Sequence, residues 1–210
     1  MTAALPDDLT ARARIREAAF RRFAAQGVEG TSLRAIAEDA GTSAALVVHH
    51  FGSKVGLVRA VDDAAVATFR TALAEVSTDQ PPDAISADFG GVFERIIGGD
   101  PVMRAYLRRA LLQDEPASTA LLDEMLDVTR LGLEALDRAG GVRADSDPRW
   151  RPYQALFIAL GSMLLEPVLQ RELDGHAFDP DVVRSRSAAN LDFFTHGMLT
   201  EPPAERRATR

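Results

Sequence analysis

The chain has no cysteine among its 210 residues, which excludes disulfide bonds, thiolate metal sites and cysteine nucleophiles. It also has no uninterrupted apolar run of the roughly 18 residues that a membrane-spanning helix needs. The first residues, MTAALPDDLTARAR, lack the basic-then-apolar order of a secretory signal peptide. We therefore expect a cytoplasmic protein that does not act at a membrane.

Common enzyme motifs are also missing. The sequence contains no HExxH, no GxSxG and no glycine-rich phosphate loop. Four histidines without cysteine leave few groups for catalysis or metal binding, so we expect no cofactor and no metal ion. An all-helical enzyme that uses carboxylate chemistry is an open alternative.

What the sequence does have is an ordinary folded composition with an uneven charge. Hydrophobic residues make up 46% and charged residues 26%, as in folded domains and unlike disordered chains. The net charge is −7, yet residues 1–60 contain eight Lys or Arg and six Asp or Glu and so carry +2. The remaining 16 basic and 25 acidic residues carry −9. This asymmetry suggests an N-terminal part that tolerates phosphates and a larger part that does not.

Apolar residues at helical spacing predict an all-α fold. Gly27 and Gly41 are placed to end the first two helices, and Thr31 or Ser32 can cap the second. The expected N-terminal helices are one through Ile15, Ala19 and Phe23, one over 33–40, one over 44–51 and a long one over about 53–76.

Asp-Pro pairs predict helix starts in the rest of the chain, because aspartate caps a helix and proline suits its first position. The pairs are Asp100-Pro101, Asp147-Pro148 and Asp179-Pro180, and helices are expected near 83–97, 101–113, 117–139, 149–172 and 180–198. Pro167 should kink or end the 149–172 helix. We expect a three-helix head over 1–54, a helical ligand-binding and dimerisation domain over 55–200 and a disordered tail over 201–210.

The two short helices before and after Gly41 form a helix-turn-helix candidate. In the second of them, Val47 and Phe51 would face the supporting helices. Ala44, Ala45, Val48 and His49 would point outward. A small, apolar outward face suits close approach to a DNA groove.

These residues match a known pattern. The stretch GTSLRAIAEDAGTSAALVVHHFGSK, within about residues 15–58, resembles the DNA-binding segment of TetR-family transcriptional regulators. The resemblance implies a head joined by a long helix to a helical-bundle domain, double-stranded operator DNA as partner, and no catalysis. It also implies that Thr31, Ser43, His49 and Lys54 contact phosphates and that Arg34 and the edge 44–46 face bases. The full DNA-binding set is Thr31, Ser32, Arg34, Ser43, Ala44, Ala45, Leu46, Val48, His49 and Lys54.

General chemistry supports part of this set. Helix N-termini offer free N–H groups to anions, and Ser43 begins a predicted helix. Lys54 is the only lysine and lies where the helix dipole prefers an acid, so a phosphate would explain it, with a solvated lysine as the alternative. Val48 replaces an aromatic residue usual in the family and removes a phosphate hydrogen bond. Arg34 is the candidate for reading a guanine, beside T-rich steps or shape readout.

Adjacent His49 and His50 could suggest a metal site. Neighbouring helical residues point about 100° apart, and no carboxylate lies four positions from either histidine. We therefore expect His50 to be packed and His49 to be exposed.

The predicted 149–172 helix is apolar nearly all round, which indicates burial on two sides. One side would meet its own domain and the other a second subunit, as in dimers that read two half-sites. The candidate dimer residues are Ala155, Ala159, Ser162, Met163, Leu191, Phe194 and Met198. A large monomeric core is the alternative.

The family resemblance also implies a small-molecule effector whose binding moves the long fourth helix. The candidate pocket residues are Phe93, Met103, Tyr106, Met125, Gln154, Phe157 and Glu166, although aromatic and methionine residues at helical spacing are more often plain core. The sequence thus predicts a homodimeric repressor released from its operator by a ligand of unknown identity. A DNA-binding dimer without an effector, either an activator or a constitutive regulator, is the main rival.

Overall fold

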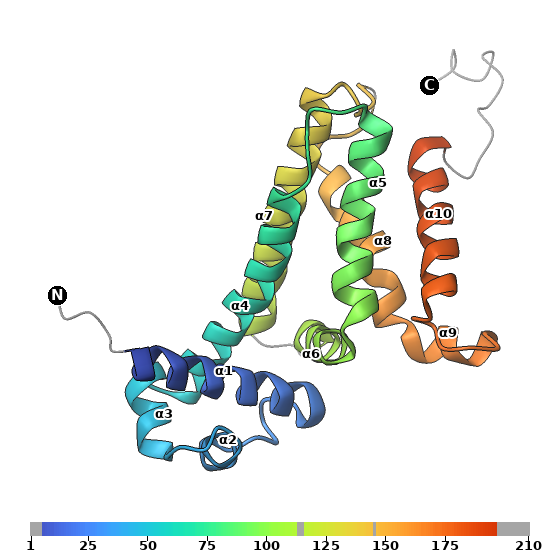
Figure 1. Ribbon diagram of the computed structural model, residues 1–210. Coiled ribbons are helices and arrows are strands. Elements are labelled where there is room, and N and C mark those ends of the chain that lie inside the picture. The colour runs from blue at the N-terminus through green and yellow to red at the C-terminus, as the bar shows by residue number, and fades with distance from the viewer. Residues whose placement is uncertain (1–5, 113–115, 145, 197–210) are drawn as a thin grey trace, which may run out of the picture.

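The computed structural model describes residues 6–112, 116–144 and 146–196, and within these ranges every regular element is a helix. The all-α prediction is confirmed, and Figure 1 shows the arrangement. The elements are α1 Pro6–Gln26, α2 Leu33–Asp39, α3 Ala44–Phe51, α4 Lys54–Ala74, α5 Pro82–Phe93, the π-helix η1 Glu94–Gly98, α6 Pro101–Leu112, α7 Pro116–Arg138, α8 Arg151–Leu164, α9 Glu166–Glu172 and α10 Pro180–His196.

Helices α1, α2 and α3, with the first turns of α4, form a small unit that we call the head (Figure 1). Its core is a set of fully buried apolar side chains, one or two from each helix: Ile15, Phe23, Ile36, Val47 and Leu57. The helices α2 and α3 have only seven and eight residues, too few to be stable alone. Their stability therefore comes from packing on α1 and α4.

The long helix α4 rises from the head along α7 (Figure 1). Leu57, Val61, Ala65 and Phe69 recur every four residues and form one buried stripe along it. Near its upper end the Phe69 ring lies 5.4 Å from that of Phe93, between ring centroids. One rigid element thus belongs to both the head and the larger unit.

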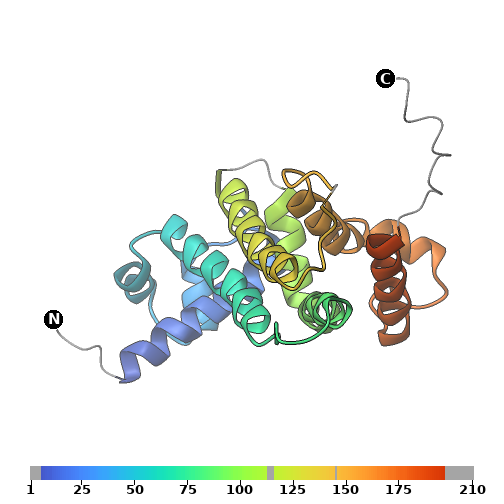
Figure 2. The same cartoon turned by 90° about the horizontal axis from the view of Figure 1, so that it is seen from above.

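Helices α5 to α10, with η1, form the C-terminal bundle. Helix α6 lies at its base and packs along α1, so it is the bundle helix in closest contact with the head (Figure 1). Seen from above, α10 stands at the edge of the molecule farthest from α2 and α3 (Figure 2).

Two predicted helices differ from the structure in detail. The expected 149–172 helix is two helices, α8 and α9, which break at Leu165 and diverge by 62°. Pro167, in the first turn of α9, cannot continue the hydrogen bonding of α8, so the expected kink is present. The expected 83–97 helix ends in the π-helical turn η1.

Helices begin at two of the three Asp-Pro pairs, and in one of these two the aspartate has a different role from the one expected. Asp100 caps α6 as expected, since its Oδ1 accepts from the N–H of Val102 and Met103 at 2.8 and 3.0 Å. Asp179 precedes α10, but its carboxylate accepts from the N–H of His176 at 2.9 Å and so caps the preceding turn. After Asp147 the helix begins only at Arg151.

No single helix of the described ranges is both long and apolar enough to cross a membrane. The bent pair α8–α9 passes that test jointly, by length and composition alone.

Candidate nucleic-acid interface

Three serines start three helices of the head in the same way. The hydroxyls of Ser32, Ser43 and Ser53 accept from backbone N–H groups three residues on, at 3.1, 3.2 and 3.1 Å. Each helix therefore begins abruptly, with the amides of its first turn pointing out of the helix end, where an anion can accept from them. The choice between Thr31 and Ser32 as the cap of α2 is settled in favour of Ser32.

Helix α3 has the two faces that its sequence predicts. Val47 is fully buried against the head core, while Ala45 and His49 are exposed and Val48 is 45% exposed. Ala44 and Leu46 are half-buried, and Ala44 packs against the core rather than pointing freely outward. The outer face of α3 is thus small and apolar, with a histidine at its end.

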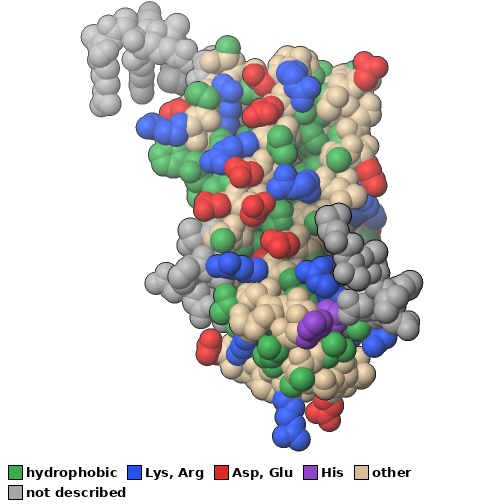
Figure 3. Space-filling view, turned by 90° about the vertical axis from the view of Figure 1, so that its left-hand side faces the viewer, with side chains coloured by type: hydrophobic (Ala, Val, Ile, Leu, Met, Phe, Trp, Pro, Cys, Tyr) green, Lys and Arg blue, Asp and Glu red, His purple; other side chains and the backbone are tan. Residues whose placement is uncertain are grey.

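Basic groups stand beside this face. Arg34 is exposed in the first turn of α2, and among the described residues no hydrogen bond or ion pair holds its side chain. Lys54 is the first residue of α4, directly after the Ser53 cap, and is half-buried. Figure 3 shows a histidine at the lower end of the molecule, with hydrophobic, basic and some acidic side chains around it.

Thr31 does not fit the phosphate contact expected of it. Its side chain is 2% exposed, and its hydroxyl donates to the carbonyl oxygen of Gly27 at 2.8 Å. The residue fixes the turn between α1 and α2, so we correct its role from binding to structural support.

Two contacts that sequence patterns do not indicate stiffen the head. The Arg22 guanidinium forms a two-pronged ion pair with Asp39, at 2.5 and 2.8 Å, which joins α1 to α2. The hydrogen bond and charge of Arg22 lower the pKa of the Asp39 carboxyl. At the other end of the head, the Arg12 guanidinium lies 5.3 Å from the centre of the Phe51 ring, beside the end of α3.

The predicted pocket residues divide into two groups. Met103, Tyr106 and Met125 are buried and Phe93 and Glu166 are half-buried, all within the bundle. Gln154 is exposed and Phe157 is 65% exposed on α8. These two side chains lie on the outer surface of α8 and do not line an interior with the other five.

Tyr106, on α6, contacts two of the helices that build the head. Its hydroxyl donates to Asp62 Oδ1 on α4 at 2.5 Å, and its ring lies 5.2 Å from that of Phe20 on α1. Burial raises the pKa of Asp62 to about 6, against the opposing effect of the Tyr106 hydrogen bond. Burial also raises the pKa of Tyr106, so the phenol keeps its proton. Tyr106 therefore joins α6 to α4 and α1.

Arg109, which the sequence analysis missed, makes a second link from α6 to the head. Its Nε and Nη2 donate to the carbonyl oxygens of Ala24 and Ala25 at 2.8 and 3.0 Å. These carbonyls lie in the last turn of α1, where a cation is favourable for the helix dipole. The partners are 85 and 84 positions apart in sequence, so local spacing carries no signal of this contact.

The candidate dimer residues are also divided. Ala155, Ala159, Ser162 and Leu191 are half-buried and Phe194 is 47% exposed, whereas Met198 lies outside the described residues. Met163 is fully buried with Leu156 and Leu160 in the chain's own core, so it cannot face a partner, and we correct its assignment. Large exposed apolar side chains on α8, α10 and the α8–α9 corner are Phe157, Leu165, Val168, Phe193 and Phe194.

Comparison with known proteins agrees with this architecture. Residues 15–61 match the family model described as bacterial regulatory proteins of the tetR family, and residues 100–200 match a tetracycline repressor-like C-terminal domain. The chain is 37% identical over 198 residues to the HTH-type transcriptional regulatory protein RaaS of Mycobacterium tuberculosis, covering 92% of this chain and 89% of that protein.

Solved structures share the fold at lower identity. FadR from Bacillus subtilis, solved in complex with stearoyl-CoA, superposes with a TM-score of 0.74 at 14% identity, over 89% of this chain and 99% of that chain. PfmR from Thermus thermophilus, a TetR-family regulator, superposes with a TM-score of 0.66 at 20% identity, over 96% and 100% of the two chains.

The matched models cover both the head and the bundle, and the family acts by binding DNA rather than by catalysis, which removes the enzyme alternative. With its helix-turn-helix head, long connecting α4 and helical C-terminal domain, the chain belongs to the TetR family of DNA-binding transcriptional regulators.

Proposed function

We propose that this regulator is a homodimeric repressor that dissociates from its operator when a small-molecule effector binds in the C-terminal bundle. The observation that carries the proposal is the double link from α6 to the head. Arg109 holds the last turn of α1, and Tyr106 holds Asp62 on α4. Any shift of α6 inside the bundle must therefore move or break contacts with the two helices that position α3.

The DNA-contacting surface in this proposal is the outer face of α3 with its flanks. Ala45 and Val48 would lie against base edges and thymine methyls, and Arg34 would donate to a guanine. Ser43, His49 and Lys54 would contact phosphates, as would the amides at the start of α2 next to Ser32. Ala44 and Leu46 would support the edge of this surface.

Dimerisation would use the outer faces of α8 and α10. Phe157, Leu165 and Phe194 are large apolar side chains at 65%, 56% and 47% exposure, and burying them against a second subunit would be favourable. The half-buried small residues Ala155 and Ala159 would let a partner helix approach closely. A two-fold dimer would present two α3 helices to half-sites about 34 Å apart.

The effector would act by changing the equilibrium between two head positions. A coupling of roughly 1–3 kcal/mol is enough to loosen DNA binding appreciably. Since FadR from Bacillus subtilis shares the fold and was solved in complex with stearoyl-CoA, a long-chain acyl-CoA is the first probe.

The direct experiment is a footprint on DNA from upstream of the protein's own coding region, followed by titration of candidate effectors into the complex. The proposal expects a protected pseudo-palindrome and at least one ligand that both raises the melting temperature of the free protein and releases the DNA. Protected DNA that no stabilising ligand releases would favour the rival, a constitutive regulator or an activator.

A further inference from the structure

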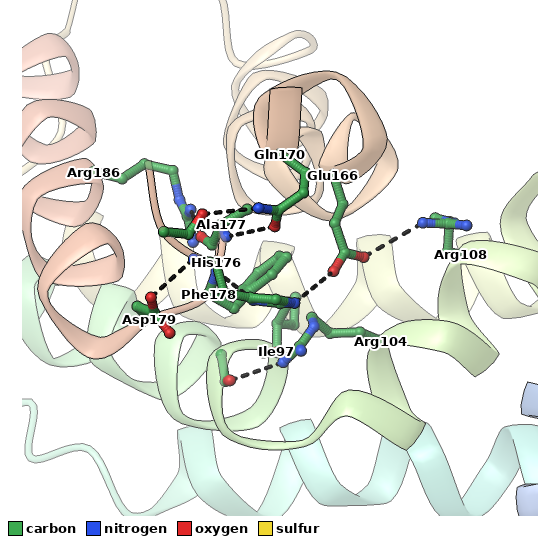
Figure 4. A network of polar contacts seen from close by, with 12 residues as sticks. Ile97, Arg104, Arg108, Glu166, Gln170, His176, Ala177, Phe178, Asp179 and Arg186 are labelled. Atoms are coloured by element: carbon green, nitrogen blue, oxygen red, sulfur yellow. Dashed lines mark hydrogen bonds and ion pairs between the residues drawn. The ribbon is translucent and has the colours of Figure 1, made fainter. Parts of the chain in front are cut away.

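Arg104, Arg186 and His176 lie around the ring of Phe178, and Arg108 faces Glu166 beside them (Figure 4). The guanidinium carbon of Arg104 lies 4.1 Å and that of Arg186 5.0 Å from the centre of this ring, which is 6% exposed. Arg108 and His176 approach from neighbouring positions, each facing Glu166. Such a concentration of basic groups is unexpected in the part of the chain that carries a net −9.

The two arginines on Phe178 repel each other and are partly removed from water. Burial lowers the pKa of Arg104 and of Arg186, and the charge of Arg104 lowers that of Arg186 further. Glu94 opposes this effect at Arg186, and Glu166 and Asp100 oppose it at Arg104. Glu166 is the one of these carboxylates that also contacts Arg108 and His176.

The guanidinium groups retain donor capacity. Arg104 Nη1 donates to the carbonyl oxygens of Ile97 and Gly98, both at 2.8 Å, at the end of the π-helix η1. Arg186 Nη1 donates to the carbonyl oxygen of Ala177 at 2.9 Å. Among contacts between described residues, the remaining N–H groups of both side chains have no acceptor, whereas a guanidinium can serve a carboxylate or phosphate with two parallel bonds.

Glu166 is the carboxylate at the centre, and its contacts are loose. Its oxygens lie 3.4 Å from Arg108 Nη1 and 3.8 Å from His176 Nε2, well beyond the roughly 2.8 Å of a good charge-assisted hydrogen bond. His176 Nδ1 accepts from the N–H of Phe178 at 3.1 Å, which leaves the ring proton on Nε2, facing Glu166. Glu166 is the first residue of the short helix α9, directly after the break at Leu165.

We propose that Arg104, Arg108 and Arg186 form a binding site for the anionic head group of the effector, a carboxylate or a phosphate, which displaces Glu166. The inference rests on the proposed release by an effector and names its chemical class, an organic anion. Arg104 and Arg108 lie on the same helix as Tyr106 and Arg109. Binding at this site therefore acts on the helix that holds α1 and α4.

The test is calorimetric titration of the full-length protein with four probes: decanoate, decyl phosphate, decanol and inorganic phosphate. The proposal expects at least one of the two amphiphilic anions to bind and decanol to fail, and comparing decanoate with decyl phosphate identifies the preferred head group. Inorganic phosphate measures the head group alone and should bind more weakly than decyl phosphate.

Arg186→Gln should weaken the anion by about tenfold or more, since it removes a charge-assisted contact. The matched control is Arg184→Gln, on the exposed side of the same helix and paired with Asp181, which should leave affinity within about twofold. Glu166→Gln should tighten binding several-fold, because the internal competitor loses its charge. If Arg186→Gln lowers the melting temperature, Arg108→Gln, whose side chain is 37% exposed, replaces it and should also weaken binding of the anion.

The proposal is overturned if no anion binds, if decanol binds as tightly as the anions, or if Arg184→Gln weakens binding as much as Arg186→Gln. Loss of binding in Glu166→Gln also overturns it. DNA release, measured on the same variants, separates the two proposals. If an anion binds through Arg186 without releasing DNA, the anion site is confirmed and the effector mechanism is refuted. If a neutral ligand releases DNA equally from the wild type and from Arg186→Gln, the effector mechanism is confirmed and the anion site is refuted.

Discussion

The head and the C-terminal bundle are held together by different kinds of contact. In the head, each capping serine hydroxyl accepts from the backbone N–H three residues on, and apolar side chains recur every three or four positions. In the bundle, the polar contacts with functional meaning join distant positions, such as Tyr106 with Asp62 and Arg108 with Glu166, which are 44 and 58 residues apart. The helices and caps of the head can therefore be predicted from local sequence, whereas the contacts between the helices of the bundle require the structure.

This difference matches what each part must recognise. A DNA surface has the same shape for every member of such a family, so the head needs the same short helices and caps. The effector differs between regulators, so the bundle can use contacts particular to one chain, such as those around Glu166.

The largest effect is expected from a negative charge on the outer face of α3, the proposed DNA-binding surface of the head. Ala45→Glu should reduce operator affinity by about 100-fold or more, because a carboxylate on α3 would face the DNA backbone and bases. The protein should stay folded, since Ala45 is exposed. Fluorescence anisotropy with labelled operator measures the affinity, and Ala74→Glu, at an exposed alanine at the far end of α4, is the control. If the two variants bind the operator with equal affinity, α3 is not part of the DNA interface.

A second large effect is expected on assembly. Phe157→Glu should weaken self-association by about 2–3 kcal/mol, since a charge would replace a large apolar side chain in the proposed interface. Analytical ultracentrifugation across a concentration series gives the dimer constant. Leu131→Glu, at a 52% exposed leucine on α7, tests whether any exposed apolar residue would give the same result. An unchanged dimer in Phe157→Glu would place the interface elsewhere.

A smaller effect should follow from Arg34→Ala. Loss of a guanidinium that donates to a guanine costs roughly 1–3 kcal/mol and relaxes preference at one base position per half-site. Binding to a library of single-base operator variants resolves this pattern. Arg21→Ala, an exposed arginine paired with Glu17 on α1, should change neither affinity nor base preference. A uniform loss across all operator variants would instead make Arg34 a phosphate contact.

The element boundaries of the head were predictable because each depends on a local signal. Ser43 and the 44–51 helix, the buried Val47 and the exposed His49 follow from spacing and caps alone. Thr31 was misjudged because a hydroxyl that bonds back to the Gly27 carbonyl looks, in sequence, like one available to a phosphate.

The bundle was predictable as helices but not as a site. Met163 and Phe157 both occur on an all-round apolar helix, and only packing shows that the first is buried and the second exposed. Arginines on a helix usually lie on a solvated surface, so no sequence pattern distinguishes Arg104, Arg109 and Arg186. Their partners are backbone carbonyls and a ring outside their own helices, which no helical periodicity encodes.

The smallest predicted effect concerns the link between the two units. The pKa of Asp62, raised to about 6 from 3.8, means that the folded protein binds this proton more tightly than the unfolded chain. The contribution of Asp62 to stability is therefore present at low pH and is lost as the pH rises through 6. From pH 5 to pH 7 the free energy of unfolding should fall by roughly 1 kcal/mol on this account.

Asp62→Asn should flatten that part of the pH profile in urea unfolding, whereas Asp63→Asn, at its exposed neighbour, should reduce it only slightly, because the charge of Asp63 is the smaller of the two causes that raise the pKa of Asp62. A wild-type slope that persists in Asp62→Asn would show that Asp62 is not the titrating group at the junction of α4 and α6.

The most direct test of the central claim is the salt dependence of operator binding by the wild-type protein and by Lys54→Gln. If the head binds DNA through phosphates, log K should fall linearly with log salt concentration, and removing Lys54 should reduce the slope by about one per subunit with little change in base preference. Binding that is absent or insensitive to salt, or a slope unchanged in Lys54→Gln together with unchanged affinity, would contradict the account.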